Sequence, residues 1–291
     1  MTETTPDYSP WIGRAEAVDD VASRAAVVQL AALLDRPVAE DGIDTAALTP
    51  TGHWLQFTPT APQSELGTDG HPRLGGFMPP LDLPRRMWAG STIDFTAPIR
   101  VGQRLRKTST IESITPKSGS SGRLCFVVLR HDVEADGVHA LTERQTIVYR
   151  EAVAPDPAAG SPRRPPREAT DVPEGWDWSQ TVVPDERLLF RFSAVTFNTH
   201  RIHYDLPYAT EVEGYPGLVV HGPLSATLIV AGFRDNHPGA EITRYEFTAR
   251  SPIFAGEQLH VVGRAAEDGA EELAVIAPGG QTAVAARIAF R

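Results

Sequence analysis

The sequence predicts an α+β fold of two tandem halves, each an antiparallel sheet wrapped around a central helix. The main observation is an internal repeat. The pattern FTA, PI, two residues, G, two residues, L occurs at residues 95–105 and again, with a two-residue insertion, at 247–259. The copies are offset by 152 residues at the Phe (247 minus 95) and by 154 at the Pro (252 minus 98). Both copies follow an apolar helical segment and open a series of strand segments, so each sheet can bury its own helix.

Length and composition agree with two domains of ordinary globular type. The chain has 291 residues, of which 41% are hydrophobic and 22% charged, which suits two domains of about 130 residues each. A net charge of -10 without a Lys/Arg cluster argues against nucleic-acid binding. No apolar run is long enough to span a membrane and the start of the chain lacks the build of a signal peptide, so a cytoplasmic protein is expected. The single cysteine, Cys125, lies in the run LCFVVL and is expected to be a buried strand residue.

The first half, residues 1–150, is predicted to hold one helix and a meander of strands. Asp20 is expected to cap a helix over 21–36 that Pro37 ends, and its interior AVVQLAALL is apolar nearly all round, so it should be central and buried. Residues 37–90 are rich in Gly and Pro and form a long excursion, a kind of segment that is usually functional. Strands are expected at 91–99, 104–114, 123–135 and 139–150.

Residues 151–178 are a predicted linker, since they are rich in proline and carry the basic run 163–167. The second half, 179–291, begins with a short apolar segment at 187–197. An apolar helix over 223–236 follows, and further strands are expected at 242–265, 272–277 and 282–290.

A polar stretch over 193–226 distinguishes the second half. It contains three histidines, an asparagine, an aspartate and an arginine between apolar segments, and it ends at the Gly-Pro that opens the second helix. The first half has no counterpart, because His53 and His71 stand isolated in predicted loops. The second half is therefore predicted to carry the chemistry, while the first supplies scaffold and ligand wall.

The spacing of Asn198, His203 and Asp205, followed by His221 and Gly222, resembles the hydratase motif of the MaoC-like, hot-dog-fold enoyl-CoA hydratases. The match is closest to a two-domain branch that includes mesaconyl-C4-CoA hydratase and the mitochondrial-type hydroxyacyl-thioester dehydratases. In that branch FNxHRIHYD, YPGLVVHGPL and a segment like LPRRMWAG, here residues 83–90, recur together. The resemblance implies a tandem hot-dog fold and a hydro-lyase that reversibly hydrates an α,β-unsaturated acyl-CoA thioester. The expected substrate is a branched C5 dicarboxylic half-thioester such as mesaconyl-C4-CoA, hydrated to a citramalyl-CoA.

Three residues are the candidates for catalysis. His203 can take a proton from water and return it to Cα, because imidazole titrates near neutrality. Asn198 occupies the position where the wider family has a catalytic Asp. Its amide can orient water but cannot take a proton, and a turn-capping role is the alternative. The backbone amide of Gly222, at a helix start with Pro223 at N1, could bind the thioester carbonyl, or the glycine could only allow close packing.

The remaining candidates are assigned to binding or to structure. Asp205 fits the N-cap of a short helix better than a catalytic acid. Arg201 could pair with a substrate carboxylate or a CoA phosphate, although an internal salt bridge is equally compatible with the sequence. The other candidate substrate-binding residues are Arg85 and Arg86 from the first half and His200, Tyr204 and His221 from the second.

Two alternatives to the diacid hydratase remain. One is a 3-hydroxyacyl-thioester dehydratase of fatty-acid type that acts on longer or carrier-bound chains, and the other is a non-catalytic acyl-CoA-binding module. A hot-dog thioesterase is disfavoured because no carboxylate stands at position 198. The sequence calls for no metal and no redox cofactor, and coenzyme A enters only as part of the substrate. Two hot-dog halves in one chain can imitate the usual dimer, and pairing of two chains into a homodimer stays open.

Overall fold

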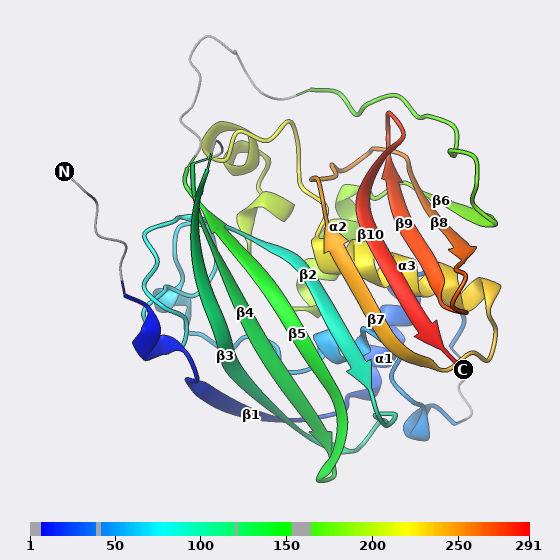
Figure 1. The fold of residues 1–291 in the computed structure, drawn as a ribbon, viewed down its shortest axis with the longest axis horizontal. Coiled ribbons are helices and arrows are strands. Elements are labelled where there is room, and N and C mark those ends of the chain that lie inside the picture. The colour runs from blue at the N-terminus through cyan, green and yellow to red at the C-terminus, as the bar shows by residue number, and fades with distance from the viewer. Residues whose placement is uncertain (1–6, 39–41, 120–121, 153–163) are drawn as a thin grey trace.

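The computed structural model describes residues 7–38, 42–119, 122–152 and 164–291 (Figure 1). The first half contains β1 (Ala15–Val21), α1 (Arg24–Leu33), β2 (Arg85–Phe95), β3 (Arg104–Gly119), β4 (Gly122–Ala135) and β5 (Val138–Arg150). The second half contains β6 (Trp178–Val182), α2 (Glu186–Val195), α3 (Gly222–Asn236), β7 (Ile242–Ala249), β8 (Leu259–Ala265), β9 (Glu271–Ala277) and β10 (Gln281–Phe290).

The ten strands form one antiparallel sheet in the order β1-β3-β4-β5-β2-β7-β10-β9-β8-β6. The order reads the same from both edges once β2 is matched with β7, β5 with β10, β4 with β9, β3 with β8 and β1 with β6. In Figure 1 the cyan strand β2 lies beside the orange strand β7 at the middle of the sheet. Strand β2 ends at the Phe of the first FTA copy and β7 contains the second copy, so the duplication predicted from the sequence is present in the fold.

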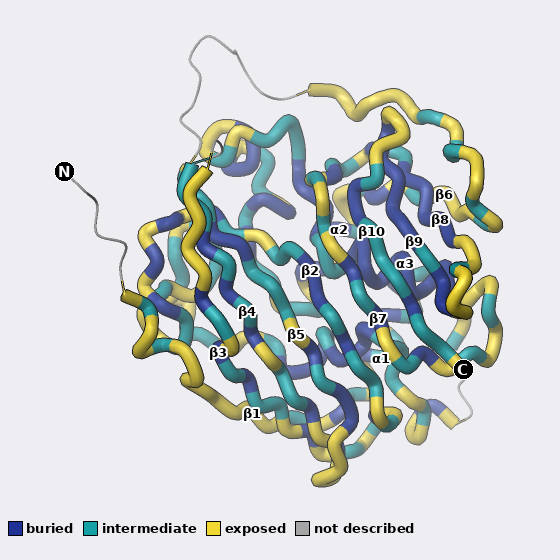
Figure 2. The backbone as a smooth tube through the Cα atoms, viewed as in Figure 1, coloured by how far each residue is buried: buried dark blue, intermediate teal, exposed yellow. Residues whose placement is uncertain are grey.

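Helix α3 is the centre of the core. Every residue from 224 to 233 is buried, and the helix packs against β2, β8, β9 and β10. The helices lie behind the sheet in the view of Figure 1, and Figure 2 shows that burial is most continuous in α3, β8 and β9. The apolar run of this helix therefore packs across the strands of the second half and reaches the seam at β2.

The prediction of the first helix was wrong in its start and its burial. Asp20 belongs to the edge strand β1, and its carboxylate accepts a hydrogen bond from Phe57 N at 2.7 Å. The helix begins three residues later, where the hydroxyl of Ser23 accepts from Ala25 N at 3.1 Å. Its buried residues are Ala26, Leu30 and Leu33, and it packs on α2 rather than at the centre of the sheet. A helix that is apolar all round has no preferred face, so its neighbours decide how much is covered.

Two further boundaries differ from the prediction. The apolar segment at 187–197 is mostly the helix α2, whose N-cap is Asp185 with Oδ1 accepting from Leu188 N at 2.9 Å. Strand β2 begins at Arg85, so the excursion is shorter than predicted, and its described part contains short 3₁₀ turns. Cys125 is a buried residue of β4, as predicted.

Much of the predicted linker, residues 153–163, and Arg163 of its basic run lie outside the described residues. Further along, Arg167 pairs with the buried Glu257 at 2.6 Å, so this part of the segment is anchored to the second half. Among the helices of the described ranges, none combines the length and the apolar character that crossing a membrane requires.

Substitution of Gly90 tests the seam between the halves, because Gly90 pairs with Thr248 where β2 meets β7. A Cβ at this position would overlap the carbonyl oxygen of Phe247. We expect Gly90→Ala to lower the free energy of unfolding by about 1–3 kcal/mol, the usual cost of overpacking. Urea unfolding of wild type and variant measures this change in stability. Gly76→Ala is the matched control, since a Cβ there meets nothing within 4 Å, and equal stabilities of the two variants would contradict the prediction.

Candidate active site

His203 lies on the 3₁₀ turn Arg201–His203 and is held from two sides. Its Nδ1 is 2.7 Å from the carbonyl oxygen of Val219, and its ring stacks on that of His221 with centroids 3.6 Å apart. A carbonyl oxygen can only accept, so Nδ1 carries the proton and Nε2 keeps its lone pair. The side chain is 7% exposed. His203 is therefore oriented as a base with one free nitrogen.

His221 and Gly222 open the central helix. His221 is the N-cap of α3 and is fully buried, with Nε2 2.8 Å from the hydroxyl of Ser193 in α2. Gly222 is the first residue of the helix and Pro223 the second, one position later than predicted. The unpaired N–H groups of a helix start favour negative charge. The stacked His221 thus places His203 beside a helix start that can stabilise an oxyanion.

Asn198 and Asp205 shape the backbone around His203. Oδ1 of Asn198 accepts a hydrogen bond from His200 N at 2.9 Å, which is a turn-capping geometry. Oδ1 of Asp205 accepts from Tyr208 N at 3.1 Å, at the start of the π-helix Tyr208–Val212, and Oδ2 pairs with Arg201 at 2.7 Å. The side-chain oxygen of Asn198 is thus committed to the backbone.

The structure separates the three candidate arginines. Arg85 is buried and pairs with the carboxylate of Glu213 at 2.5 Å. Arg201 pairs with Asp205 and lies over the ring of Tyr208 at 4.1 Å. Within the described ranges Arg86 has no ion pair, so of these three arginines it is the one whose charge is available to a ligand.

Tyr204 lies at the surface of the protein. Its side chain is 48% exposed and its hydroxyl donates to the carbonyl oxygen of Thr199 at 3.1 Å. That hydrogen bond ties the ring to the loop that precedes His203.

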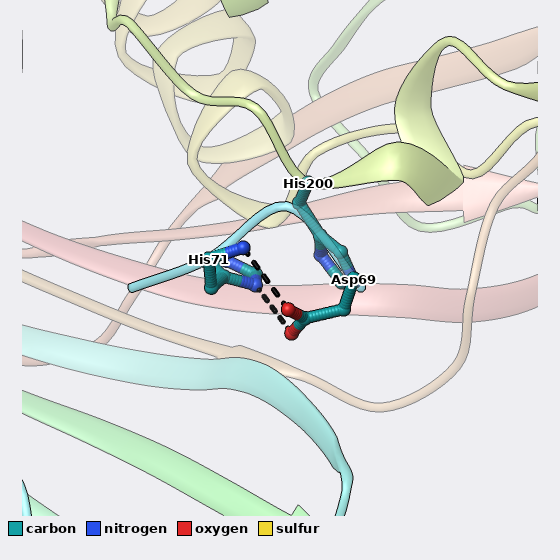
Figure 3. Close-up of side chains that lie close together, drawn as sticks. All are labelled: Asp69, His71 and His200. Carbon is teal, nitrogen blue, oxygen red and sulfur yellow. Dashed lines mark hydrogen bonds and ion pairs between the residues drawn. The ribbon is translucent and has the colours of Figure 1, made fainter. Parts of the chain in front are cut away.

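Sequence reasoning missed His71 and Asp69, which the excursion of the first half brings to His200 (Figure 3). The ring centroids of His71 and His200 are 4.2 Å apart, and His200 in turn lies edge-on to His203 at 5.3 Å. Nδ1 of His71 is 2.9 Å from Oδ2 of Asp69. The length of the excursion indicated a functional segment, but no local pattern showed where it docks.

A cavity of about 340 Å³ is lined by Asp69 and His71, whereas His200 and His203 are not part of its lining. It is bounded by the excursion, by the ends of β2 and β5 and by the π-helix. The polar and charged side chains that line it include Asp69, His71, Arg73, Arg86, Tyr149 and Tyr208. The Tyr149 hydroxyl is buried and has no hydrogen-bond partner in the described part of the chain. The cavity therefore offers the cations Arg73 and Arg86 to a ligand, with Arg86 beside the Tyr149 hydroxyl, whose pKa is raised by burial against the opposing effect of the Arg86 charge.

Burial keeps the histidines of the site neutral at pH 7. Burial lowers the pKa of His203 and of His71 to about 4 each, and the Arg86 charge adds to the effect at His71. It also lowers the pKa of His200 and of His221, whose neighbouring histidines add to the shift. Neutral imidazoles are bases, so the site is built to accept protons rather than to bind anions by imidazolium charge.

Asp69, His71 and His200 also present ligand atoms within 4.8 Å of one another, as a metal site would. Both oxygens of Asp69 already accept hydrogen bonds from His71, one from its backbone N–H and one from its ring. Arg86 is close enough to lower the pKa values of Asp69 and His71. A cation at this position would meet a neighbouring positive charge.

The doubled sheet and the buried helix define a double hot-dog protein, a fold that solved structures share. One is a MaoC-like dehydratase from Phytophthora capsici, with a TM-score of 0.67 at 12% identity over 96% of each chain. Residues 51–255 match the sequence profile of hydroxyacyl-thioester dehydratase type 2. The chain belongs to this family, which confirms the prediction of a MaoC-like hydro-lyase.

Two curated relatives are similar over most of their length. Mesaconyl-C(4)-CoA hydratase of Chloroflexus aurantiacus is 44% identical over 285 residues, which cover 98% of each chain. The mitochondrial hydroxyacyl-thioester dehydratase type 2 of Schizosaccharomyces pombe is 29% identical over 274 residues, covering 83% of this chain and 87% of the relative.

The buried histidines predict a pH-dependent stability. Between their folded pKa of about 4 and the ordinary value of about 6.5, the unfolded chain binds protons that the folded chain does not. Stability is therefore complete above about pH 6.5 and falls as the pH decreases. We expect the free energy of unfolding to fall by about 2 kcal/mol for each of His203 and His71 when the pH falls from about 7 to about 5. Urea unfolding at both pH values measures this, and a flat profile would contradict it.

Proposed function

We propose that this chain reversibly hydrates an α,β-unsaturated acyl-CoA thioester, and that its substrate is a branched C5 dicarboxylic half-thioester such as mesaconyl-C4-CoA, which yields a citramalyl-CoA. The observation that carries the proposal is the cavity lined by His71, Arg86 and Tyr149. The 44% identity to a hydratase of that substrate supports it. The chemistry needs no cofactor, and coenzyme A enters as part of the substrate.

The proposed reaction uses the free nitrogen of His203. Nε2 takes a proton from water while the water oxygen bonds to the β carbon. The electron pair of the double bond moves through Cα to the thioester oxygen, where the N–H of Gly222 stabilises the enolate. The imidazolium of His203 then returns its proton to Cα, and the sum is the addition of one water. An oxyanion donor of this kind contributes about 3–4 kcal/mol to the transition state.

The position of Arg86 favours a diacid over a fatty acyl chain. In a mesaconyl half-thioester with CoA at C4, the free carboxylate and the methyl group are both attached to the β carbon, where water adds. A cation that recognises this carboxylate must therefore lie beside the acid–base group, not at the end of a tunnel. Arg86 and His71 line one cavity, and their register places Arg86 opposite Tyr149 on the neighbouring strand. A long alkyl chain would have to desolvate these groups, which is costly.

His203→Ala tests the reaction. We expect wild type to hydrate mesaconyl-C4-CoA faster than itaconyl-CoA or crotonyl-CoA, followed by loss of the enoyl-thioester absorbance. The variant should lose at least ~100-fold in kcat, the low end for a general acid–base group. His139→Ala is the matched control, because His139 is exposed on β5. A His203→Ala variant as fast as wild type, with its fold intact by circular dichroism, would refute the assignment.

Arg86→Gln tests the substrate class. Loss of the charge should raise KM for mesaconyl-C4-CoA by ~10-fold or more, because a charge-assisted hydrogen bond contributes about 1.5–3 kcal/mol, and should leave crotonyl-CoA nearly unaffected. Arg85→Gln serves as the comparison, since the ion pair of Arg85 with Glu213 is structural. Equal effects of Arg86→Gln on the two substrates would speak against carboxylate recognition by this residue.

A further inference from the structure

Hydration requires a second hydrogen-bond acceptor for the attacking water, and the proposed site residues do not supply one. An attacking water has two hydrogens, and it is held firmly only when both are accepted. His203 can accept one of them through Nε2. Asn198 stands where the wider family has a catalytic carboxylate, but its Oδ1 already accepts from the backbone N–H of His200. Its amide nitrogen can only donate, so a second acceptor has to come from elsewhere.

His71 has the properties of that acceptor. A carboxylate can only accept, so the bond of 2.9 Å between Oδ2 of Asp69 and Nδ1 of His71 places the ring proton on Nδ1. Nε2 of His71 then carries a lone pair, and no hydrogen bond to it is present in the described part of the chain. His71 also lines the cavity and lies against His200, which separates it from His203. His71 and His203 therefore have the same tautomer and lie on two sides of the His200 ring.

The docking of the excursion holds His71 in place. Within the turn, Gly67 N donates to His71 O at 2.7 Å, and Oδ1 of Asp69 accepts from His71 N at 3.0 Å. This turn is also hydrogen-bonded to the second half, since Arg201 N donates to Asp69 O at 2.9 Å. A position so fixed costs little reorganisation when the reaction occurs.

Gly70 makes the close approach of the two backbones possible. Its φ is +91°, and a Cβ would overlap the carbonyl oxygen of Thr199. The hydroxyl of Thr199 donates to Gly70 O, so the contact is bonded in addition to being close. The segment before His203 and the turn that carries His71 thus form one unit across the two halves.

We propose that His71 is a second hydrogen-bond acceptor for the attacking water and that Asp69 is its positioning residue. This inference rests on the proposed function. The water donates one hydrogen to Nε2 of His203, which takes it as a proton when the oxygen bonds to the β carbon. The other hydrogen bonds to Nε2 of His71 and remains on the oxygen as the hydroxyl hydrogen of the product. Atoms and charge balance as before, because His203 still returns its proton to Cα. The first half therefore supplies an acceptor in place of the carboxylate missing at 198.

His71→Ala with added imidazole tests this role. We expect kcat for the preferred enoyl-CoA to fall by ~10-fold, the loss expected for one hydrogen bond in the transition state, with KM changed much less. Free imidazole should enter the vacated space beside the cavity and restore kcat in proportion to its concentration. A structural role would not respond to imidazole. Asp69→Asn should also lower kcat, because it removes the charge that fixes the tautomer, but imidazole should not restore it.

Controls separate this inference from the proposed function. His139→Ala should behave as wild type with or without imidazole. His71→Leu fills a similar space without a hydrogen-bond acceptor and should lose kcat with an unchanged melting temperature, which covers the case that His71→Ala does not fold. A wild type inactive on every enoyl-CoA would refute the proposed function. An active wild type with His203→Ala impaired and His71→Leu unimpaired would overturn only the role of His71. Loss of activity after dialysis against EDTA, with recovery on Zn²⁺, would overturn it in favour of a metal site.

Discussion

The pairing of β2 with β7 is the constraint on which the rest of the structure depends. It joins two five-stranded sheets into one through the register Gly90 with Thr248 to Asp94 with Arg244. Because β2 follows the excursion directly, the same pairing brings the turn at 67–71 to the stretch that precedes α3. A glycine at position 90 is the local requirement, since a side chain there would meet the partner backbone. The seam of the fold is therefore also the place where the site forms.

The two halves have diverged in what they bury. The second half buries α3 and uses its start for the site, whereas the first half leaves α1 partly open against α2. The first half buries Glu143 instead, with His53 and Trp54 each 3.0 Å from its carboxylate. Burial alone would raise the pKa of Glu143, but the hydrogen bonds and charge of His53, with Ser91, lower it to about 2. This network is satisfied by its own partners, which explains why His53 serves the scaffold.

The site is a group of neutral bases at the junction of the halves. Stacking, a backbone carbonyl and a carboxylate fix the rings of His203 and His71, and burial keeps both uncharged at pH 7. Arg86 adds the positive charge of the cavity, from the strand that also forms the seam. The arrangement separates proton acceptance from the positive charge, as the proposed addition of water to an anionic acyl group would require.

The sequence by itself determined the duplication, the sheet-and-helix class and the polar stretch that contains His203, because these follow from local periodicity and from residues adjacent in the chain. It did not determine the face that α1 buries, since an apolar helix without a polar side has no intrinsic orientation. Nor did it place His71 beside His200, which lies 129 residues further along the chain (200 minus 71). That contact depends on strand pairing across the seam and on the hydrogen bond that the Thr199 hydroxyl donates to Gly70 O. Such long-range contacts leave no periodic pattern in the sequence, so only the tertiary structure decided them.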